Sequence, residues 1–287
     1  MMDDKILVFV YGTLRKHEQN SSLMKNATCV SMQAWTYGAL FDSGNGYPTM
    51  VCDSSQKVYG ELYEISKEQL HELDGLVGNK GEHSKTHYDR ITQTVYTAET
   101  SFEKVVVYVY KRADHWTKVV FGDWKCHKYL NQDKLLYFAY GSCMDDERFH
   151  RHRVQHLFHL KGCGKANNFS LAYTRLASDG GRADMLESKS IVEGKVYEIT
   201  QEGLNYLYRR EGVHANIYRP AFIDIDMNGK TYYDVLTFLV IDKMAETAPP
   251  EHYAREILRG AKGFLSDTYF AKLEKELYDK FQMKVTI

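Results

Sequence analysis

The feature that most constrains the fold of this chain is an internal repeat. Residues 9–14, with the sequence Phe-Val-Tyr-Gly-Thr-Leu, reappear as residues 138–143, with the sequence Phe-Ala-Tyr-Gly-Ser-Cys. A second matching pair, residues 58–70 and 192–204, follows in the same order and is again roughly 130 residues apart. Because this period is too long for the stacked units of a solenoid, the sequence predicts a tandem duplication of a whole domain.

The chain has 287 residues, which suits two domains of about 100–200 residues each. Strand-like periodicity stops and restarts once, so we expect a domain at 1–122, a linker or interdomain helix at 123–134 and a second domain at 135–287. In each half, a strand ending in Tyr-Gly precedes a polar segment, more strands, a short helix and closing strands. This order predicts an α+β fold of two tandem domains, each a small mixed β-barrel with short helices.

Four helices are expected from capping residues and apolar spacing. Residues 66–73 and 200–210 each begin with a Ser or Thr that can cap a helix, and leucines follow at helical spacing. The second half alone continues into a tail. There, residues 249–257 and 266–281 are expected to form two helices separated by glycines.

Composition and charge exclude several classes of partner. The 37 Lys and Arg residues nearly balance the 38 Asp and Glu residues, so we expect neither a nucleic-acid partner nor a membrane-surface partner. No apolar run approaches a membrane span, and the N-terminal residues enter a strand-like segment without a signal sequence. The scattered cysteines contain no Cys-x-x-Cys pair and indicate reduced thiols in a cytoplasmic protein: Cys29, Cys52, Cys126, Cys143 and Cys163.

Two features of the second half could carry chemistry. Tyr140-Gly141-Ser142 ends a predicted strand, where consecutive amide N–H groups could meet a ligand oxygen, although such a tripeptide alone is more often a plain turn. Glu211 ends a predicted helix, and the helix dipole would raise the pKa of a carboxyl group there, as suits a general base. On spacing alone, a solvated glutamate beside Arg210 is the commoner explanation.

Taken in order, the motifs of the second half resemble those of the γ-glutamylcyclotransferase family. They cover nearly all of residues 135–287, while residues 1–120 resemble the shorter AIG2-like and γ-glutamylamine cyclotransferase branch. The matching segments are 137–142, 180–183, 193–197, 211–213, 248–253 and 260–262 in the second half, and 10–15, 60–65 and 73–74 in the first. The resemblance implies two tandem γ-glutamylcyclotransferase-like domains.

The resemblance also implies a lyase reaction that needs neither a metal nor a cofactor. The α-amine of a small γ-glutamyl substrate attacks its own γ-amide carbonyl, and 5-oxoproline and an amine leave. Glu211 matches the catalytic glutamate of the family, and Tyr253 matches a substrate-binding tyrosine. The family's substrate-binding loop matches Tyr137, Phe138, Ala139, Tyr140, Gly141 and Ser142, and its first-half counterpart is Tyr11, Gly12, Thr13 and Leu14.

The first half departs from the family at the position of the catalytic glutamate. Alignment forward from the predicted helix places Val77 opposite Glu211, whereas alignment back from Tyr88 places Glu82 near that position. Three interpretations follow: both halves are active, the second half is catalytic and the first structural, or the whole chain binds γ-glutamyl or other carboxylate metabolites without catalysis.

Three other groups of side chains have simpler explanations. Cys143 stands where the family usually has Asn, but nothing in its flanking sequence supplies a base that would make it a nucleophile. His152, His156 and His159 could bind zinc from one helical face, although a solvated face is the commoner outcome. Arg182 could bind a substrate carboxylate or form an internal salt bridge.

Overall fold

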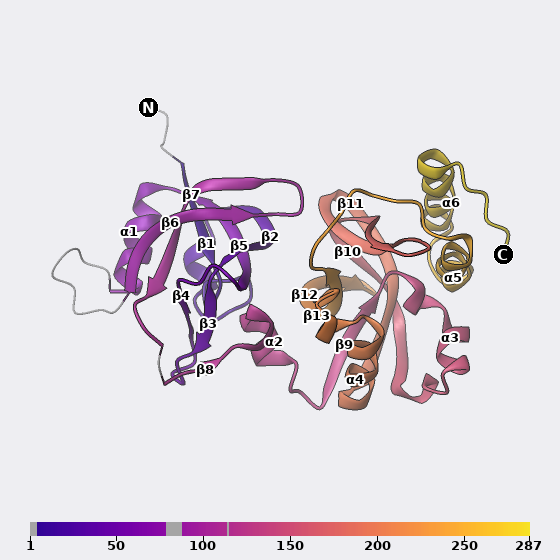
Figure 1. Ribbon diagram of the computed structural model, residues 1–287, viewed down its shortest axis with the longest axis horizontal. Coiled ribbons are helices and arrows are strands. Elements are labelled where there is room, and N and C mark those ends of the chain that lie inside the picture. Colours follow the sequence, from indigo (N-terminus) through magenta and orange to yellow (C-terminus); the bar gives the residue numbers. More distant parts are fainter. Residues whose placement is uncertain (1–4, 79–87, 114) are drawn as a thin grey trace. The chain divides into compact units, whose positions relative to one another are not determined.

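The computed structural model describes residues 5–78, 88–113 and 115–287. The chain separates into two compact units, Met1–Lys128 and Tyr129–Ile287 (Figure 1). Each unit has its own barrel and its own helices, so each is described by itself.

The first unit is built around a closed barrel of five strands in the order β1-β5-β2-β6-β7. The barrel strands are β1 (Ile6–Val10), β2 (Thr28–Tyr37), β5 (Lys57–Ile65), β6 (Tyr88–Tyr96) and β7 (Ser101–Tyr110). A smaller sheet and two α-helices complete the unit: β3 (Ala39–Asp42), β4 (Pro48–Val51), β8 (Thr117–Lys118), α1 (Lys67–Leu76) and α2 (Trp124–Tyr129).

The second unit contains a closed barrel in the order β10-β11-β9-β13-β12. Its strands are β9 (Lys134–Ala139), β10 (Phe158–Ala177), β11 (Gly180–Thr200), β12 (Tyr218–Met227) and β13 (Lys230–Val240). Its helices are α3 (Asp146–Arg151), α4 (Gln201–Arg210), α5 (Glu251–Ala261) and α6 (Asp267–Phe281), and α5 and α6 lie side by side (Figure 1).

The two barrels share one topology. The strand that opens each barrel, β1 or β9, pairs antiparallel with β5 or β11 and parallel with β7 or β13. The repeated glycines of β5 and β11 also have the same surroundings. A Cβ atom on Gly60 would lie 2.3 Å from the carbonyl oxygen of Val10, and one on Gly194 would lie 2.3 Å from that of Ala139. The predicted α+β fold of two small barrels is therefore confirmed.

Alternation along β1 divides the core of the first unit. Phe9 belongs to a hydrophobic cluster that contains Val58, whereas Val8 and Val10 belong to a second cluster that contains Leu73 of α1. Successive side chains of a strand point to opposite faces. The opening strand therefore contributes to both clusters, and its last residue leads directly into the Tyr-Gly turn.

The four helices expected from capping and spacing are confirmed. Ser66 forms a capping box with Gln69 at the start of α1, whereas the side chain of Thr200 makes no capping hydrogen bond at α4. Part of the expected linker forms α2, whose Trp124 packs into the core of the first unit. Among the described residues, no helix combines the length and the apolar character needed to cross a membrane.

Candidate functional site

The second unit has a small, nearly filled cavity of about 30 Å³ at the turn that follows β9. This turn begins at Gly141 and continues into the short 3-10 helix Ser142–Met144. Strand, helix and tail residues surround it: Tyr137, Tyr140, Gly141, Ser142, Cys143, Ala183, Glu211, Tyr218, Phe238 and Tyr253. The cavity thus joins the predicted loop to the predicted base and to the predicted tail tyrosine.

Close packing holds the turn against β11 and α5. A Cβ atom on Gly141 would lie 3.0 Å from that of Ala183, so only glycine allows this approach without movement of its neighbour. The hydroxyl oxygen of Tyr253, on α5, accepts a hydrogen bond from the backbone N–H of Ala183 at 3.2 Å. The tail helix therefore closes one wall of the cavity.

Glu211 is the C-cap residue of α4, and Gly212 follows it in the left-handed conformation at φ 63°. That turn ends the helix and directs the carboxylate into the cavity, where 17% of the side chain remains exposed. Burial raises the pKa of Glu211, and the nearby guanidinium of Arg210 opposes this rise. The pKa of Glu211 is raised, as the sequence argument expected, but the largest cause is burial and not the helix dipole.

Arg210 connects Glu211 to the turn. Its guanidinium donates hydrogen bonds to Ser142 Oγ at 2.7 Å and to Cys143 Sγ at 2.8 Å, and its Nε lies 3.7 Å from Glu211 Oε1. The Cys143 thiol in turn donates to Glu211 Oε1 at 3.4 Å. The flanking sequence gave Cys143 no basic partner, but the fold places it between a carboxylate and a guanidinium.

The Cys143 thiol stays protonated in these surroundings. Burial raises its pKa more than the adjacent Arg210 lowers it. A protonated thiol is a hydrogen-bond donor and a weak nucleophile, which agrees with the contact that it makes to Glu211. Cys143 therefore holds the carboxylate in place.

Buried tyrosines form most of the remaining wall. The Tyr140 hydroxyl donates to the carbonyl oxygen of Phe238 at 2.6 Å, and the Tyr218 hydroxyl donates to that of Ala183 at 2.7 Å. Burial raises the pKa of Tyr137, Tyr140 and Tyr218, so their hydroxyls remain neutral. Sequence analysis did not assign Tyr218, Phe238 or Ala183 to the site, although Ala183 lies in the matching segment 180–183. The linear order does not indicate which residues of β11, β12 and β13 meet the turn.

Two of the expected substrate-binding residues lie outside this cavity. Phe138 is fully buried, and its ring packs where a Cβ atom on Gly194 would lie, 2.8 Å away. Ala139 is buried in β9 and is absent from the residues that line the cavity. Alternation along β9 turns Phe138 toward the barrel core, and the expectation that Phe138 and Ala139 contact substrate stays a prediction.

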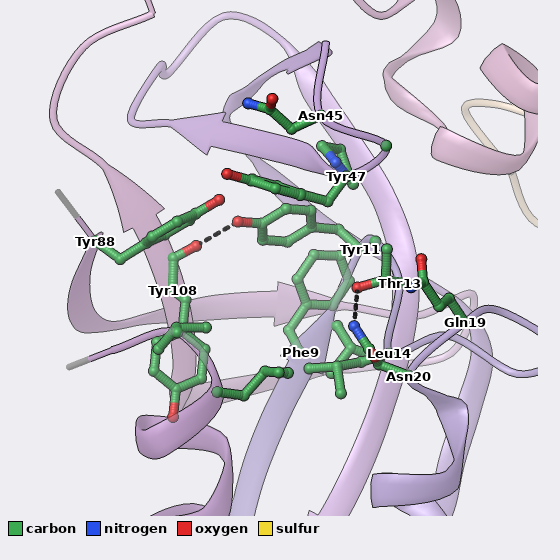
Figure 2. A pocket seen from close by; sticks show the side chains of 16 residues that line it. Phe9, Tyr11, Thr13, Leu14, Gln19, Asn20, Asn45, Tyr47, Tyr88 and Tyr108 are labelled. Carbon is green, nitrogen blue, oxygen red and sulfur yellow. Dashed lines mark hydrogen bonds between the residues drawn. The ribbon is translucent and has the colours of Figure 1, made fainter. Parts of the chain in front are cut away.

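The first unit has a much larger pocket, of about 350 Å³, at the matching turn after β1 (Figure 2). All four predicted loop residues line it, and Figure 2 shows the rings of Tyr11, Tyr47 and Tyr88 gathered on one side. The complete lining is Phe9, Val10, Tyr11, Gly12, Thr13, Leu14, Gln19, Asn20, Asn45, Gly46, Tyr47, Pro48, Leu76, Val77, Tyr88 and Tyr108.

The two pockets correspond at several positions. The Tyr11 hydroxyl donates to the carbonyl oxygen of Tyr108 at 2.7 Å, which repeats the contact between Tyr140 and Phe238 in the second unit. Val77 is the C-cap residue of α1, as Glu211 is of α4, and it lines the first pocket. The other alignment placed Glu82 opposite Glu211, and Glu82 lies outside the described residues.

The remaining sequence candidates have structural partners. Arg182 forms a salt bridge with Asp179 at 2.6 Å, and its guanidinium lies 4.9 Å from the ring centre of Tyr253. α3 ends at Arg151, so His152 and His156 do not share a helical face. No cluster of three His, Cys, Asp or Glu residues suited to a metal ion occurs in residues 5–78, 88–113 and 115–287.

The duplicated barrels, with a Tyr-Gly turn facing the end of a helix in each, define the class of protein to which the chain belongs. It is a member of the γ-glutamylcyclotransferase family. The family described as "Gamma-glutamyl cyclotransferase, AIG2-like" matches residues 8–126, and the AIG2-like family matches residues 191–273.

Similarity to individual proteins extends over the whole chain. YkqA of Bacillus subtilis (strain 168) is 41% identical over 279 residues, which cover 94% of this chain and 97% of YkqA. The crystal structure of YkqA matches with a TM-score of 0.85 and covers 98% of this chain and 100% of that one. The γ-L-glutamyl-butirosin B γ-glutamyl cyclotransferase of Niallia circulans is 39% identical over 122 residues, or 42% of this chain and 76% of that protein.

Proposed function

We propose that the second unit is a γ-glutamylcyclotransferase, a carbon–nitrogen lyase that releases 5-oxoproline from γ-glutamyl amides. The α-amine of the substrate attacks its own γ-carbonyl carbon, a new C–N bond closes the five-membered ring, and the original amide C–N bond breaks. The attacking nitrogen loses two protons, one before attack and one as the ring closes, and Glu211 relays them to the leaving nitrogen, which departs as an ammonium group. Atoms and charge balance without water, and proximity is built into the substrate.

The observation that carries this proposal is the shared cavity of Glu211 and the Tyr140-Gly141-Ser142 turn. A base must lie within reach of the amine while the carbonyl is held in place, and these groups face one another across a small space. A carboxylate with a raised pKa is a stronger base than an ordinary glutamate, so Glu211 takes a proton from the α-ammonium group more readily.

The neighbours of Glu211 divide the remaining tasks. Arg210 opposes the rise that burial causes in the pKa of Glu211, and the Cys143 thiol donates to one of the carboxylate oxygens. Tyr253 orients the backbone at Ala183 and forms the wall nearest the turn. The Tyr140 and Tyr218 hydroxyls already donate to backbone carbonyls, whereas the Tyr253 hydroxyl accepts from Ala183 and can donate its own proton to an oxygen of a γ-glutamyl group.

We further propose that the leaving amine belongs to a small molecule. The relative of Niallia circulans is named for γ-L-glutamyl-butirosin B. A protected antibiotic intermediate is one of three classes of leaving amine that share the same γ-glutamyl end. The other two are free amino acids and the side chain of an isopeptide-linked lysine. A panel that contains one member of each class and glutathione will separate them.

The test is 5-oxoproline release by the full chain and by Glu211→Gln across this panel. Glu202→Gln is the matched control, because Glu202 is exposed at the other end of α4. We expect the Glu211 variant to lose at least about a hundredfold in rate and the Glu202 variant to keep full activity. If Glu211→Gln stays active and the activity disappears on adding Glu82→Gln, the reaction belongs to the first unit and the present assignment is wrong.

A second candidate function is binding of γ-glutamyl compounds without turnover. The small volume of the second cavity and the engagement of Glu211 by Arg210 favour it. In that case, isothermal titration calorimetry would detect saturable binding of a γ-glutamyl amide while no 5-oxoproline accumulates.

A further inference from the structure

The pocket of the first unit differs from its counterpart in charge. In the second unit, Glu211 stands at the end of α4 and can pair with the α-ammonium of a γ-glutamyl group. At the matching position of the first unit stands Val77. Of the sixteen described residues that line the first pocket, none has a charged side chain.

An α-ammonium group placed in such a pocket has no counter-ion among these residues. Moving a charged group out of water costs several kcal/mol, roughly, unless an opposite charge or full hydrogen bonding replaces the lost hydration. A ligand whose α-ammonium is replaced by hydrogen avoids this cost and keeps every other contact. Within the described lining nothing offsets this cost, which favours ligands without an α-ammonium group.

The groups that remain suit amide and carboxyl oxygens. Thr13 Oγ1 accepts a hydrogen bond from Asn20 Nδ2 at 3.0 Å, and the side-chain amides of Gln19 and Asn45 also line the pocket (Figure 2). Burial raises the pKa of Tyr88 to about 12, so its hydroxyl stays neutral. These side chains offer neutral donors and acceptors.

The size and walls of the pocket suit more than a glutaryl chain. A volume of 350 Å³ falls within the range of small-molecule sites, roughly 300–1,000 Å³. The rings of Phe9, Tyr11 and Tyr47 line it, and flat aromatic or apolar groups pack well on such walls (Figure 2). An amide that carries an aromatic or apolar substituent would fill the space.

We propose that the first unit binds acids that bear an amide and lack an α-ammonium group, such as glutaryl amides, and does not cyclise γ-glutamyl amides. The pocket is thus a second ligand site with a preference opposite to that of the second unit. This assignment concerns binding and stands whether or not the second unit turns over substrate.

Two probes that differ only at the α-carbon test the preference. Glutaryl-4-nitroanilide and γ-L-glutamyl-4-nitroanilide are titrated by calorimetry into the full chain carrying Glu211→Gln, which stops turnover in the second unit. We expect the glutaryl probe to bind at least about tenfold more tightly at the site that responds to changes at Val77.

Substitutions at Val77 in the same background locate the site and test the charge argument. Val77→Phe narrows the pocket and should abolish binding of the glutaryl probe. Val77→Glu supplies the missing carboxylate and should shift the preference toward the γ-glutamyl probe by roughly ten- to a hundredfold, whereas the neutral Val77→Gln should leave it unchanged. Thermal unfolding of each variant reports whether its fold is intact.

Three outcomes would overturn the proposal. The first is that neither probe binds in a manner that depends on Val77. The second is a preference of the unsubstituted pocket for the γ-glutamyl probe, including one that disappears on Glu82→Gln and so identifies that carboxylate as the counter-ion. The third is that Val77→Glu and Val77→Gln change the affinities for both probes to the same extent. This would exclude charge at position 77 as the cause of the preference between the probes.

Discussion

Arg210→Gln is the substitution that most directly tests how the second unit limits the rise in the pKa of its buried base, Glu211. The guanidinium Nε lies 3.7 Å from Glu211 Oε1, and only 13% and 17% of the two side chains are exposed. At this separation the attraction is about 4 kcal/mol for an effective dielectric constant near 20 and about 1 kcal/mol in bulk water. Because roughly 1.36 kcal/mol corresponds to one pH unit, loss of the cation should displace the pH at which Glu211 ionises by about one to three units.

The sign follows from the charges. Arg210 stabilises the ionised carboxylate, so its removal raises the pKa of Glu211 further above its usual value. The base is then ionised only at higher pH, and the acidic limb of the pH profile of kcat/KM should move upward by roughly one to three pH units. At pH values above the displaced limb, most of the lost rate should return.

Arg209→Gln is the matched control, because it removes the same charge from an exposed position one residue earlier. Its limb should stay where it is in the unsubstituted protein. Carbon-13 NMR titration of the Glu211 carboxyl group measures the same displacement without turnover. If the limb and the NMR titration stay in place in Arg210→Gln, or move to lower pH, the electrostatic role of Arg210 is refuted.

Three further predictions concern stability and binding. Burial raises the pKa of Glu211 in the folded protein, so the folded state loses stability as pH rises above the pKa of the unfolded chain, about 4.5. The Tm of Glu211→Gln minus that of the unsubstituted protein should therefore increase between about pH 4 and 8. A Tm difference that stays constant over this range would contradict the prediction. Tyr253→Phe removes the acceptor of the Ala183 N–H, which should cost about 1–2 kcal/mol and raise KM by roughly tenfold, with an unchanged KM as the contrary result. Gly60→Ala should lower the free energy of unfolding by at least about 2 kcal/mol in chemical denaturation, because its Cβ meets a carbonyl oxygen of β1, whereas Gly75→Ala, inside α1 with no atom within 4 Å, should raise it by about 0.5–1 kcal/mol.

The sequence predicted the features that are local or repeated. The Tyr-Gly motif marked the end of the opening strand in both halves, because a strand that stops at a glycine turn leaves a short, recognisable pattern. The position of Glu211 at the end of α4 followed from helical spacing and from Gly212. Such features depend on neighbours in the chain, so the linear order contains the information.

The features that escaped prediction depend on contacts across the barrel. Tyr218 and Phe238 reach the site because of the register between β12 and β13 and the pairing of β13 with β9. Register and pairing follow from the packing of whole strands and leave no local signature. Phe138 lies outside the cavity because alternation along β9 separates it from Tyr137, whereas the family resemblance treats the segment as one loop.

The ion pairs that hold the two Tyr-Gly turns to their barrels show how the duplicated units have diverged while keeping the same geometry. In the first unit the buried Glu61 of β5 accepts from Arg15 Nε at 3.3 Å and from the Tyr63 hydroxyl at 2.9 Å. In the second unit the matching strand position is Lys195, which donates to Asp146 at 2.9 Å, just beyond the turn.

The strand thus carries the negative charge in the first unit and the positive charge in the second, and the segment after the turn carries the opposite charge in each. Both pairs hold that segment against the barrel. In the first unit both partners are buried, and removing one of them would leave an uncompensated charge that costs about 3–5 kcal/mol. In the second unit Asp146 is 52% exposed, so the corresponding cost is smaller. A turn carrying Arg15 would meet Lys195 if it were transferred to the second barrel, and like charges would face one another. Each turn is therefore matched to its own barrel, which allows the pocket beside it to acquire its own size and charge without loss of the shared fold.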